Sequence, residues 1–309
     1  MSWTRPRALG RGDLLGICAP AAAVDAERLR RGAARLEEMG FRVRLGSAVG
    51  ERRLFTAGSV ERRVADLHGF FRDDEVAAVV CARGGAGSGW LLPHLDAELL
   101  RAHPKPFLGY SDATYLHLLF NRLRVVTFHG PMVAEEFPDG RYDEASWRAA
   151  LHAGEAPYAS APGDLFPLRD GEVEGRLLGG CLSILAAAAG TPWALRPDAA
   201  GTLLFLEDVD ERPYRVDRLL LQLRSSGAFE GVRGVVFGDM KGCNPPATAD
   251  FTLEDVIRES LSGLEIPIAL GLSSGHASGP GVTLPLGVRA RLRCHGEDAR
   301  FEVLEPSVQ

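Results

Sequence analysis

A serine at position 111 lies between a short apolar segment, residues 106–109, and a helical pattern over residues 112–123. We therefore expect the chain to turn from strand to helix at Ser111. Gly109 and Ala113 lie two residues before and after it, so the stretch reads G-x-S-x-A, close to the G-x-S-x-G elbow of serine hydrolases. An elbow exposes the serine hydroxyl for attack on a carbonyl carbon. The alternative is a helix N-cap, whose hydroxyl accepts a backbone N–H.

Two further polar groups follow predicted strands in the second half of the chain. Glu207 comes directly after the apolar run 201–206, and His276 lies in the loop SSGHASGPG after the apolar segment 268–270. A carboxylate beside a histidine can orient and charge a general base. Each residue alone has a plainer explanation, a solvated acidic cluster or an ordinary loop histidine. A metal site is disfavoured because only one histidine is near and no calcium-loop pattern occurs.

A glycine cluster, Arg83-Gly84-Gly85-Ala86-Gly87, follows the predicted strand 75–82. It has neither the G-x-G-x-x-G spacing nor the Gly-Lys-Ser/Thr ending of nucleotide-binding loops. Its backbone N–H groups could form an oxyanion hole if the loop lies beside Ser111. An ordinary turn between strand and helix is the alternative.

Composition indicates an ordinary globular protein. The 309 residues are 46% hydrophobic and 25% charged, and the net charge of -6 argues against a general binder of nucleic acid or anionic membranes. The five cysteines are scattered, which fits reduced thiols and a cytoplasmic location. The N-terminus has no run typical of a signal peptide. The most apolar stretch, 177–190, is too short to span a bilayer, and we expect a core helix there.

Strands and helices alternate in the first half, which predicts a parallel sheet covered on both faces. Residues 135–171 are irregular and resemble a domain connection. We therefore expect an α/β domain over residues 1–135, a linker over 136–170 and a β/α domain over 171–309. The expected strands are residues 13–19, 41–45, 75–82, 106–109, 201–206, 232–238, 267–270, 288–294 and 300–304, and the other expected helices are residues 26–39, 59–71, 143–151 and 214–225.

In their order along the chain, the motifs R-G-G-x-G, G-Y-S-D-A-T, H-G-P, L-E-D-V-D-E-R-P-Y-R-V-D-R and G-H followed by L-P-L-G closely resemble the LD-carboxypeptidase family of serine peptidases. The resemblance runs from about residue 13 to residue 292. It implies a flavodoxin-like parallel-sheet N-terminal domain and a smaller swivelling β/α C-terminal domain. It also implies a catalytic triad of Ser111 as nucleophile, Glu207 as orienting acid and His276 as general base.

The resemblance further implies a substrate and its contacts. Family members remove the C-terminal D-alanine from cytoplasmic murein tetrapeptides, a bond between an L-centre and a D-residue, and they need no metal or organic cofactor. The implied oxyanion hole is the N–H of Asp112 with a donor from the glycine loop, for which we choose Gly85 over Gly84. The substrate's free carboxylate calls for an arginine, and Arg83 is the best placed by sequence, although Arg212 or Arg218 would serve.

Two departures from the family pattern leave the substrate open. Ala86 replaces a usual aromatic residue and Cys181 a common asparagine. A first alternative is therefore a microcin C-type immunity peptidase that cleaves peptidyl-nucleotides. A second is a non-catalytic α/β protein that binds a small ligand, with Ser111 as a helix cap. A third, a cysteine hydrolase using Cys81 or Cys243, is disfavoured because neither lies at an elbow. The sequence leaves open whether the chain forms a homodimer.

Overall fold

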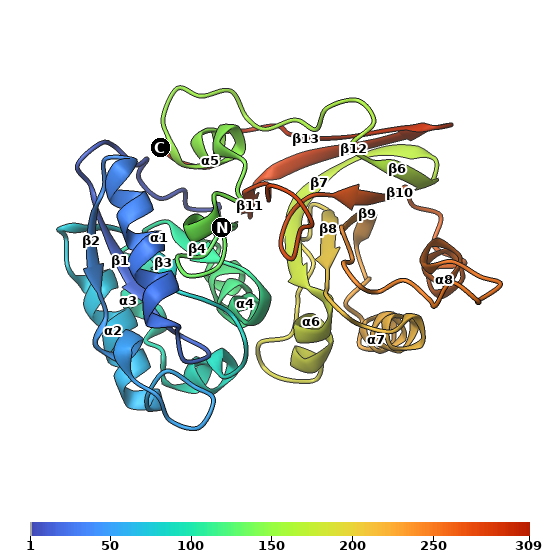
Figure 1. The fold of residues 1–309 in the computed structure, drawn as a ribbon. Helices are drawn as coiled ribbons and strands as arrows, with labels where there is room; N and C mark the ends of the chain where they lie inside the picture. The colour runs from blue at the N-terminus through green and yellow to red at the C-terminus, as the bar shows by residue number, and fades with distance from the viewer. Residues whose placement is uncertain (1) are drawn as a thin grey trace.

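The computed structural model describes residues 2–309 and consists of two α/β halves lying side by side (Figure 1). The first half carries a six-stranded sheet of order β11-β5-β4-β3-β1-β2. The five strands of the first half are parallel neighbours in the order 2-1-3-4-5 of flavodoxin-like folds. They are β1 (Leu14–Cys18), β2 (Arg42–Leu45), β3 (Val76–Cys81), β4 (Phe107–Gly109) and β5 (Thr127–His129). The predicted flavodoxin-like α/β class is confirmed.

Helices cover both faces of the first sheet. One core cluster packs α1 and α5 side chains on one face, and another packs α2, α3 and α4 side chains on the other. Asp25 and Ser59 cap the first two helices, because their side chains accept the backbone N–H groups of Arg28 and Arg62. The helices are α1 (Ala26–Glu38), α2 (Val60–Arg72), α3 (Ala97–Ala102), α4 (Thr114–Leu123) and α5 (Glu144–Leu151), with 3₁₀ turns η1 (Ser47–Gly50), η2 (Ser88–His94), η3 (Ser111–Ala113) and η4 (Phe137–Asp139).

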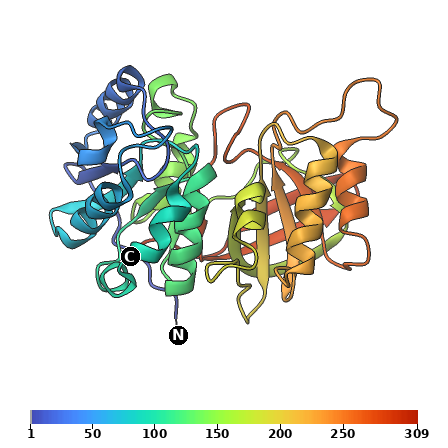
Figure 2. The ribbon, with the colours of Figure 1, turned by 90° about the horizontal axis from the view of Figure 1, so that it is seen from below.

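The second half carries a seven-stranded sheet of order β13-β12-β7-β8-β9-β10-β6. Strands β7 to β10 are parallel, and the remaining strands pair antiparallel at both edges. Three helices form one layer on this sheet, seen in yellow to orange in Figure 2. The elements are β6 (Phe166–Arg169), β7 (Gly171–Cys181), α6 (Leu182–Ala188), β8 (Thr202–Glu207), α7 (Pro213–Ser225), β9 (Val232–Gly238), α8 (Leu253–Ser260), β10 (Ile268–Leu272), β12 (Arg289–His295) and β13 (Asp298–Val303).

The predicted core helix over residues 177–190 is wrong in its first part. Strand β7 continues to Cys181 and pairs with β8 before α6 begins at Leu182. Gly179 and Gly180 have φ angles of 139° and 140°, far from helical values. A short apolar run does not distinguish a buried strand from a helix, which explains the error.

One strand crosses between the halves. β11 (Leu284–Leu286) comes from the second half of the sequence and pairs antiparallel with β5 of the first sheet. Directly after it, Gly287 N donates to the carbonyl of Leu177 in β7. Within residues 2–309, no helix is long and apolar enough to cross a membrane.

Candidate active site

Ser111 lies on a strained turn at the carboxyl edge of β4. Its φ angle is 60°, a left-handed value that a residue other than glycine rarely adopts. The turn is tight because Gly109 lies against Cys81, where a Cβ atom would come within 2.8 Å of the thiol sulfur. Ala113 occupies the N-cap position of α4 and no side-chain bond caps that helix in the described chain, so Ser111 is not its N-cap. The geometry is that of an elbow.

Glu207 and His276 meet directly. Glu207 ends β8, and its Oε2 lies 2.8 Å from His276 Nδ1 and 3.1 Å from the His276 backbone nitrogen. The close approach needs glycine at position 275, because a Cβ atom there would overlap the Glu207 carboxylate. Burial would raise the pKa of Glu207, but His129 and His276 outweigh it and hold that pKa at about 2.

The same ion pair acts on the histidine. Burial would lower the pKa of His276, but the hydrogen bond and the charge of Glu207 raise it above 6.5. An ionised carboxylate at Nδ1 orients the ring with Nε2 facing away, so Nε2 can accept a proton. The pair has the chemistry of a general base.

His129, the histidine of the H-G-P motif, for which the sequence indicated no role, is the second partner of Glu207. It ends β5, is fully buried, and its Nε2 lies 3.6 Å from Glu207 Oε1, longer than a normal hydrogen bond. Ser274 Oγ donates to the Val282 carbonyl and lies 3.2 Å from His129 Nδ1, so the Ser274 oxygen accepts from that ring nitrogen. The contact joins strand ends of both sheets and was not visible as a spacing in the sequence.

Tyr110 joins His276 to the turn that carries Ser111 through a ring contact. Its ring lies edge-on to the His276 ring, with centroids 5.0 Å apart, and it directly precedes Ser111. Its hydroxyl donates to buried Glu136 at 2.8 Å, which fixes the ring. No hydrogen bond joins Ser111 Oγ to His276 within residues 2–309. Such bonds are often long before substrate binds.

The glycine loop also lies against Ser111. A Cβ atom on Gly84 would meet Ser111 Oγ at 2.9 Å and the Asp112 nitrogen at 3.6 Å. The Gly84 carbonyl accepts a hydrogen bond from Ala22 N at 3.2 Å. In the trans peptide between Gly84 and Gly85, the C=O and the N–H point in opposite directions, so the N–H of Gly85 points away from Ala22. Gly85 and Asp112 both line a cavity of about 440 Å³, whose lining also includes Ile184 and Ala187 of α6.

The three candidate arginines are less clearly placed. Arg83 donates to the Ala23 carbonyl at 3.2 Å and lies 3.5 Å from a Glu135 oxygen. Arg218 stacks on the Tyr214 ring, 5.5 Å from its centroid, and Arg212 is exposed. Arg83 is the one that begins the glycine loop, but its guanidinium already has partners.

The cysteines are poor nucleophiles here. Burial raises the pKa of Cys81 well above its usual value and the pKa of Cys243 to about 11. All five cysteines are free and buried. In residues 2–309, no group of three or more His, Cys, Asp or Glu side chains could hold a metal ion.

Comparison with known families assigns both halves. Residues 15–130 match the model of the LD-carboxypeptidase N-terminal domain, and residues 174–292 match that of the C-terminal domain. A probable murein peptide carboxypeptidase of Bacillus subtilis is 38% identical over 305 residues, covering 96% of this chain and 94% of the relative. The murein tetrapeptide carboxypeptidase of Pseudomonas aeruginosa is 34% identical over 272 residues, covering 85% and 88%.

Solved structures agree on the fold. A muramoyltetrapeptide carboxypeptidase from Oxalobacter formigenes superposes with a TM-score of 0.83 and 29% identity, covering 95% of this chain and 99% of that one. A microcin self-immunity protein superposes with a TM-score of 0.88 and 24% identity, covering 99% of this chain and all of the other. The second likeness concerns the fold alone.

Proposed function

The chain belongs to the LD-carboxypeptidase family, and from this premise we propose that it hydrolyses the L,D-peptide bond before the C-terminal D-alanine of a murein tetrapeptide. The observation that carries the proposal is Ser111 on a left-handed elbow, directly after Tyr110, whose ring packs against the histidine of the pair formed by buried Glu207 and half-buried His276. A helix cap needs no such strain. A base with a buried carboxylate partner is what a serine nucleophile requires.

In the proposed reaction, His276 Nε2 takes the proton of Ser111 as its Oγ attacks the scissile carbonyl carbon. Glu207 holds the imidazole and stabilises its charged form. The amine of D-alanine leaves with the proton from His276. Water then attacks the acyl-enzyme with His276 again as base, which releases the shortened peptide and restores Ser111.

The oxyanion of each tetrahedral intermediate would rest on the N–H groups of Gly85 and Asp112. Both residues line the 440 Å³ cavity, and first-turn N–H groups such as that of Asp112 lack a partner within their own helix. Arg83 is the proposed partner of the terminal carboxylate, which would take the place of Glu135. Free thiols and a murein-fragment substrate favour a cytoplasmic site of action.

The first test is chemical. A fluorophosphonate probe should label the wild-type protein and not Ser111→Ala, and the variant should lose tetrapeptide turnover by roughly 10³-fold or more while it keeps its fold. Circular dichroism gives the folding control. If Ser111→Ala keeps activity within about tenfold of wild type, the assignment fails.

The alternative substrate is a peptidyl-nucleotide, as suggested by the similarity to the microcin self-immunity protein. The test is to give both substrates to the same preparation and compare kcat/KM. We expect the tetrapeptide to be cleaved faster. Turnover of the peptidyl-nucleotide alone would replace the proposal by the immunity function.

A further inference from the structure

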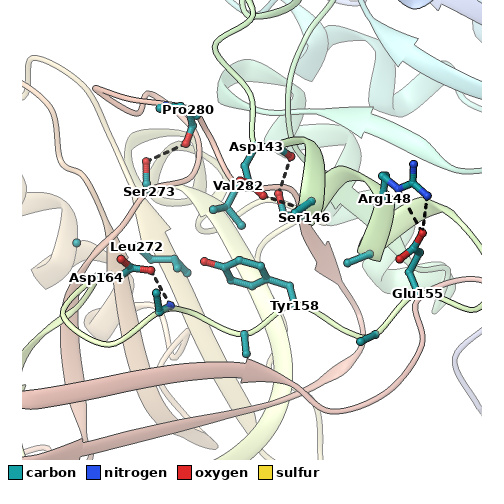
Figure 3. Close-up of a pocket in the computed structure, with 16 residues that line it drawn as sticks. Asp143, Ser146, Arg148, Glu155, Tyr158, Asp164, Leu272, Ser273, Pro280 and Val282 are labelled. Carbon is teal, nitrogen blue, oxygen red and sulfur yellow. Dashed lines mark hydrogen bonds and ion pairs between the residues drawn. The ribbon is translucent and has the colours of Figure 1, made fainter. Parts of the chain in front are cut away.

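The largest of the described cavities, about 790 Å³, lies between α5, residues 155–164 and the end of β10 (Figure 3). Its polar groups already satisfy one another. Asp143 accepts from Ser146 N, and Arg148 pairs with Glu155 at 2.8 Å. Tyr158 also lines the cavity, but among the described residues no charged side chain there lacks a partner that would indicate a ligand, so its size alone indicates nothing.

A smaller cavity, about 330 Å³, lies where the end of α4 meets the connection between α6 and β8. Side chains from both halves of the chain line it. They include Trp3, Asn121, Arg122 and Arg124 on one side and Arg196 and Asp198 on the other. Its volume is in the range of small-molecule sites.

The amide of Asn121 is unsatisfied in this cavity. Both its Nδ2 and Oδ1 atoms are buried, and neither has a hydrogen-bond partner among residues 2–309. Nη1 of Arg122 is in the same condition. Buried polar atoms without partners are uncommon because each costs free energy, and here three lie on consecutive residues beside one cavity.

The cavity also carries excess positive charge. Asp198 is already engaged, because it lies 3.2 Å from both Arg124 Nη1 and Trp3 Nε1. Arg122 and Arg196 have no ion-pair partner in the part of the chain that the structure describes. Burial, and after it the nearby charge of Arg196, lower the pKa of Arg122.

The helix dipole does not explain why the polar atoms of Asn121 and Arg122 are buried without partners. Arg122 lies in the last turn of α4, where a cation complements the helix dipole. That effect acts on an exposed side chain equally well, so it requires neither the burial of Arg122 Nη1 nor the unsatisfied amide beside it. Both observations have one explanation if a negatively charged group occupies the cavity.

We propose that this cavity is a binding site for a small oxyanion, a phosphate or carboxylate group, held by Arg122, Arg196 and the Asn121 amide. The arginines supply charge-assisted N–H donors, and Asn121 Nδ2 supplies a neutral one. Asn121 Oδ1 accepts, so a ligand with an O–H or N–H beside its anionic group fits best. Because the walls come from both halves, the bound anion joins them.

The test uses inorganic phosphate and acetate as probes, titrated by calorimetry into the full chain at ionic strength held constant with sodium chloride. We expect saturable binding of at least one probe with a Kd below about 1 mM. Arg122→Gln should weaken it at least about tenfold, as loss of a charge-assisted bond does. The matched control is Arg101→Gln, an equal loss of charge on a residue that does not line the cavity, and it should bind as wild type. The absence of saturable binding, or equal affinity in both variants, overturns the proposal.

A second variant keeps the test independent of any folding defect in Arg122→Gln. Asn121→Asp keeps the side-chain shape and puts a carboxylate beside the two arginines. Without added anion it should raise Tm relative to wild type, and it should abolish phosphate binding. A lower Tm together with unchanged phosphate binding would contradict the proposal that Arg122 and Arg196 bind an anion in this cavity. Neither readout depends on peptidase activity.

Discussion

At the scale of single residues, two acids compete for the role beside His276. Glu207 is 1% exposed and bonded to both the ring and the backbone of His276. Glu211, four residues later, pairs instead with Arg215 at the start of α7. A carboxylate can orient an imidazole only if its own position is fixed. The structure fixes Glu207 and gives Glu211 a separate structural partner.

We predict that Glu207→Gln lowers kcat at least about a hundredfold, while Glu211→Gln has a much smaller effect or acts mainly on KM. Gln keeps the size of each side chain and removes its charge, so packing is conserved. Steady-state kinetics of the two variants on one substrate tests the assignment. The reverse order of losses would transfer the role to Glu211.

The pH dependence follows from the same pair. His276 must be neutral to accept the serine proton, and Glu207 raises its pKa above 6.5. We therefore expect kcat/KM to rise with pH through an acid limb centred above about 6.5. In Glu207→Gln the limb should move to lower pH, because burial still disfavours the charged ring while its anionic partner is gone. A limb that stays in place in the variant would show that another group titrates.

At the scale of elements, close packing decides at which helical glycines a larger side chain would not fit. Gly32 lies inside α1, where a Cβ atom would overlap the carbonyl oxygen of Val133. Gly69 lies inside α2, and a Cβ atom there meets no heavy atom within 4 Å. The two positions have the same helical conformation and differ only in their surroundings. They form a matched pair.

We predict opposite effects of alanine at these two sites. Gly69→Ala should raise the free energy of unfolding by about 0.5–1 kcal/mol, because alanine favours the helix. Gly32→Ala gains the same helix term but forces α1 away from Val133, and overpacking costs about 1–3 kcal/mol or more, so the variant should be less stable than wild type. Urea denaturation measures both. Equal shifts in one direction would mean that α1 adjusts without strain.

The elements that could be predicted are those whose local pattern of apolar and polar residues is itself typical of a helix or a strand. The alternating strands and helices of residues 13–82 were predicted within about two residues, because each is a continuous apolar or amphipathic run. Strand β11 was missed because it has only three residues and exists through its pairing with β5. His129 was passed over for a related reason. Its contact with Glu207 depends on how two sheets meet, and no local pattern encodes that.

At the scale of the whole molecule, the candidate site lies where strand ends of the two mixed sheets meet. Ser111 and His129 follow or end strands of the first sheet, and Glu207 ends a strand of the second. The loop that carries His276 begins after β10 in the second sheet and ends at β11 in the first. Both ends of that loop are therefore fixed, each by a different half. The position of His276 therefore depends on how the halves are joined.

The halves are also joined outside the site. One hydrophobic core cluster contains Leu15 and Ile17 of β1 together with Leu177 and Phe205 of the second sheet. The chain ends meet on the first half, where Gln309 N donates to the Pro6 carbonyl and Ala8 N donates to Gln309. The two halves predicted from the sequence, residues 1–135 and 171–309, are not closed units, because β11 pairs in the first sheet and β6 of the predicted linker pairs in the second. We propose that they depend on each other for stability.

This dependence predicts one cooperative unfolding transition. Independent domains would open separately, each with its own free energy, whereas a shared core and the exchanged strand β11 make the loss of one sheet expose apolar surface on the other. Hydrogen exchange followed by mass spectrometry at rising urea should give the same midpoint for β3 and for β9, and Gly32→Ala should lower both midpoints together although it alters only the first half. The Gly69→Ala variant provides the control, with both midpoints raised. If β9 stays protected after β3 has exchanged, the second half is stable by itself, and the contacts of β11 and of the shared core contribute less than their burial indicates.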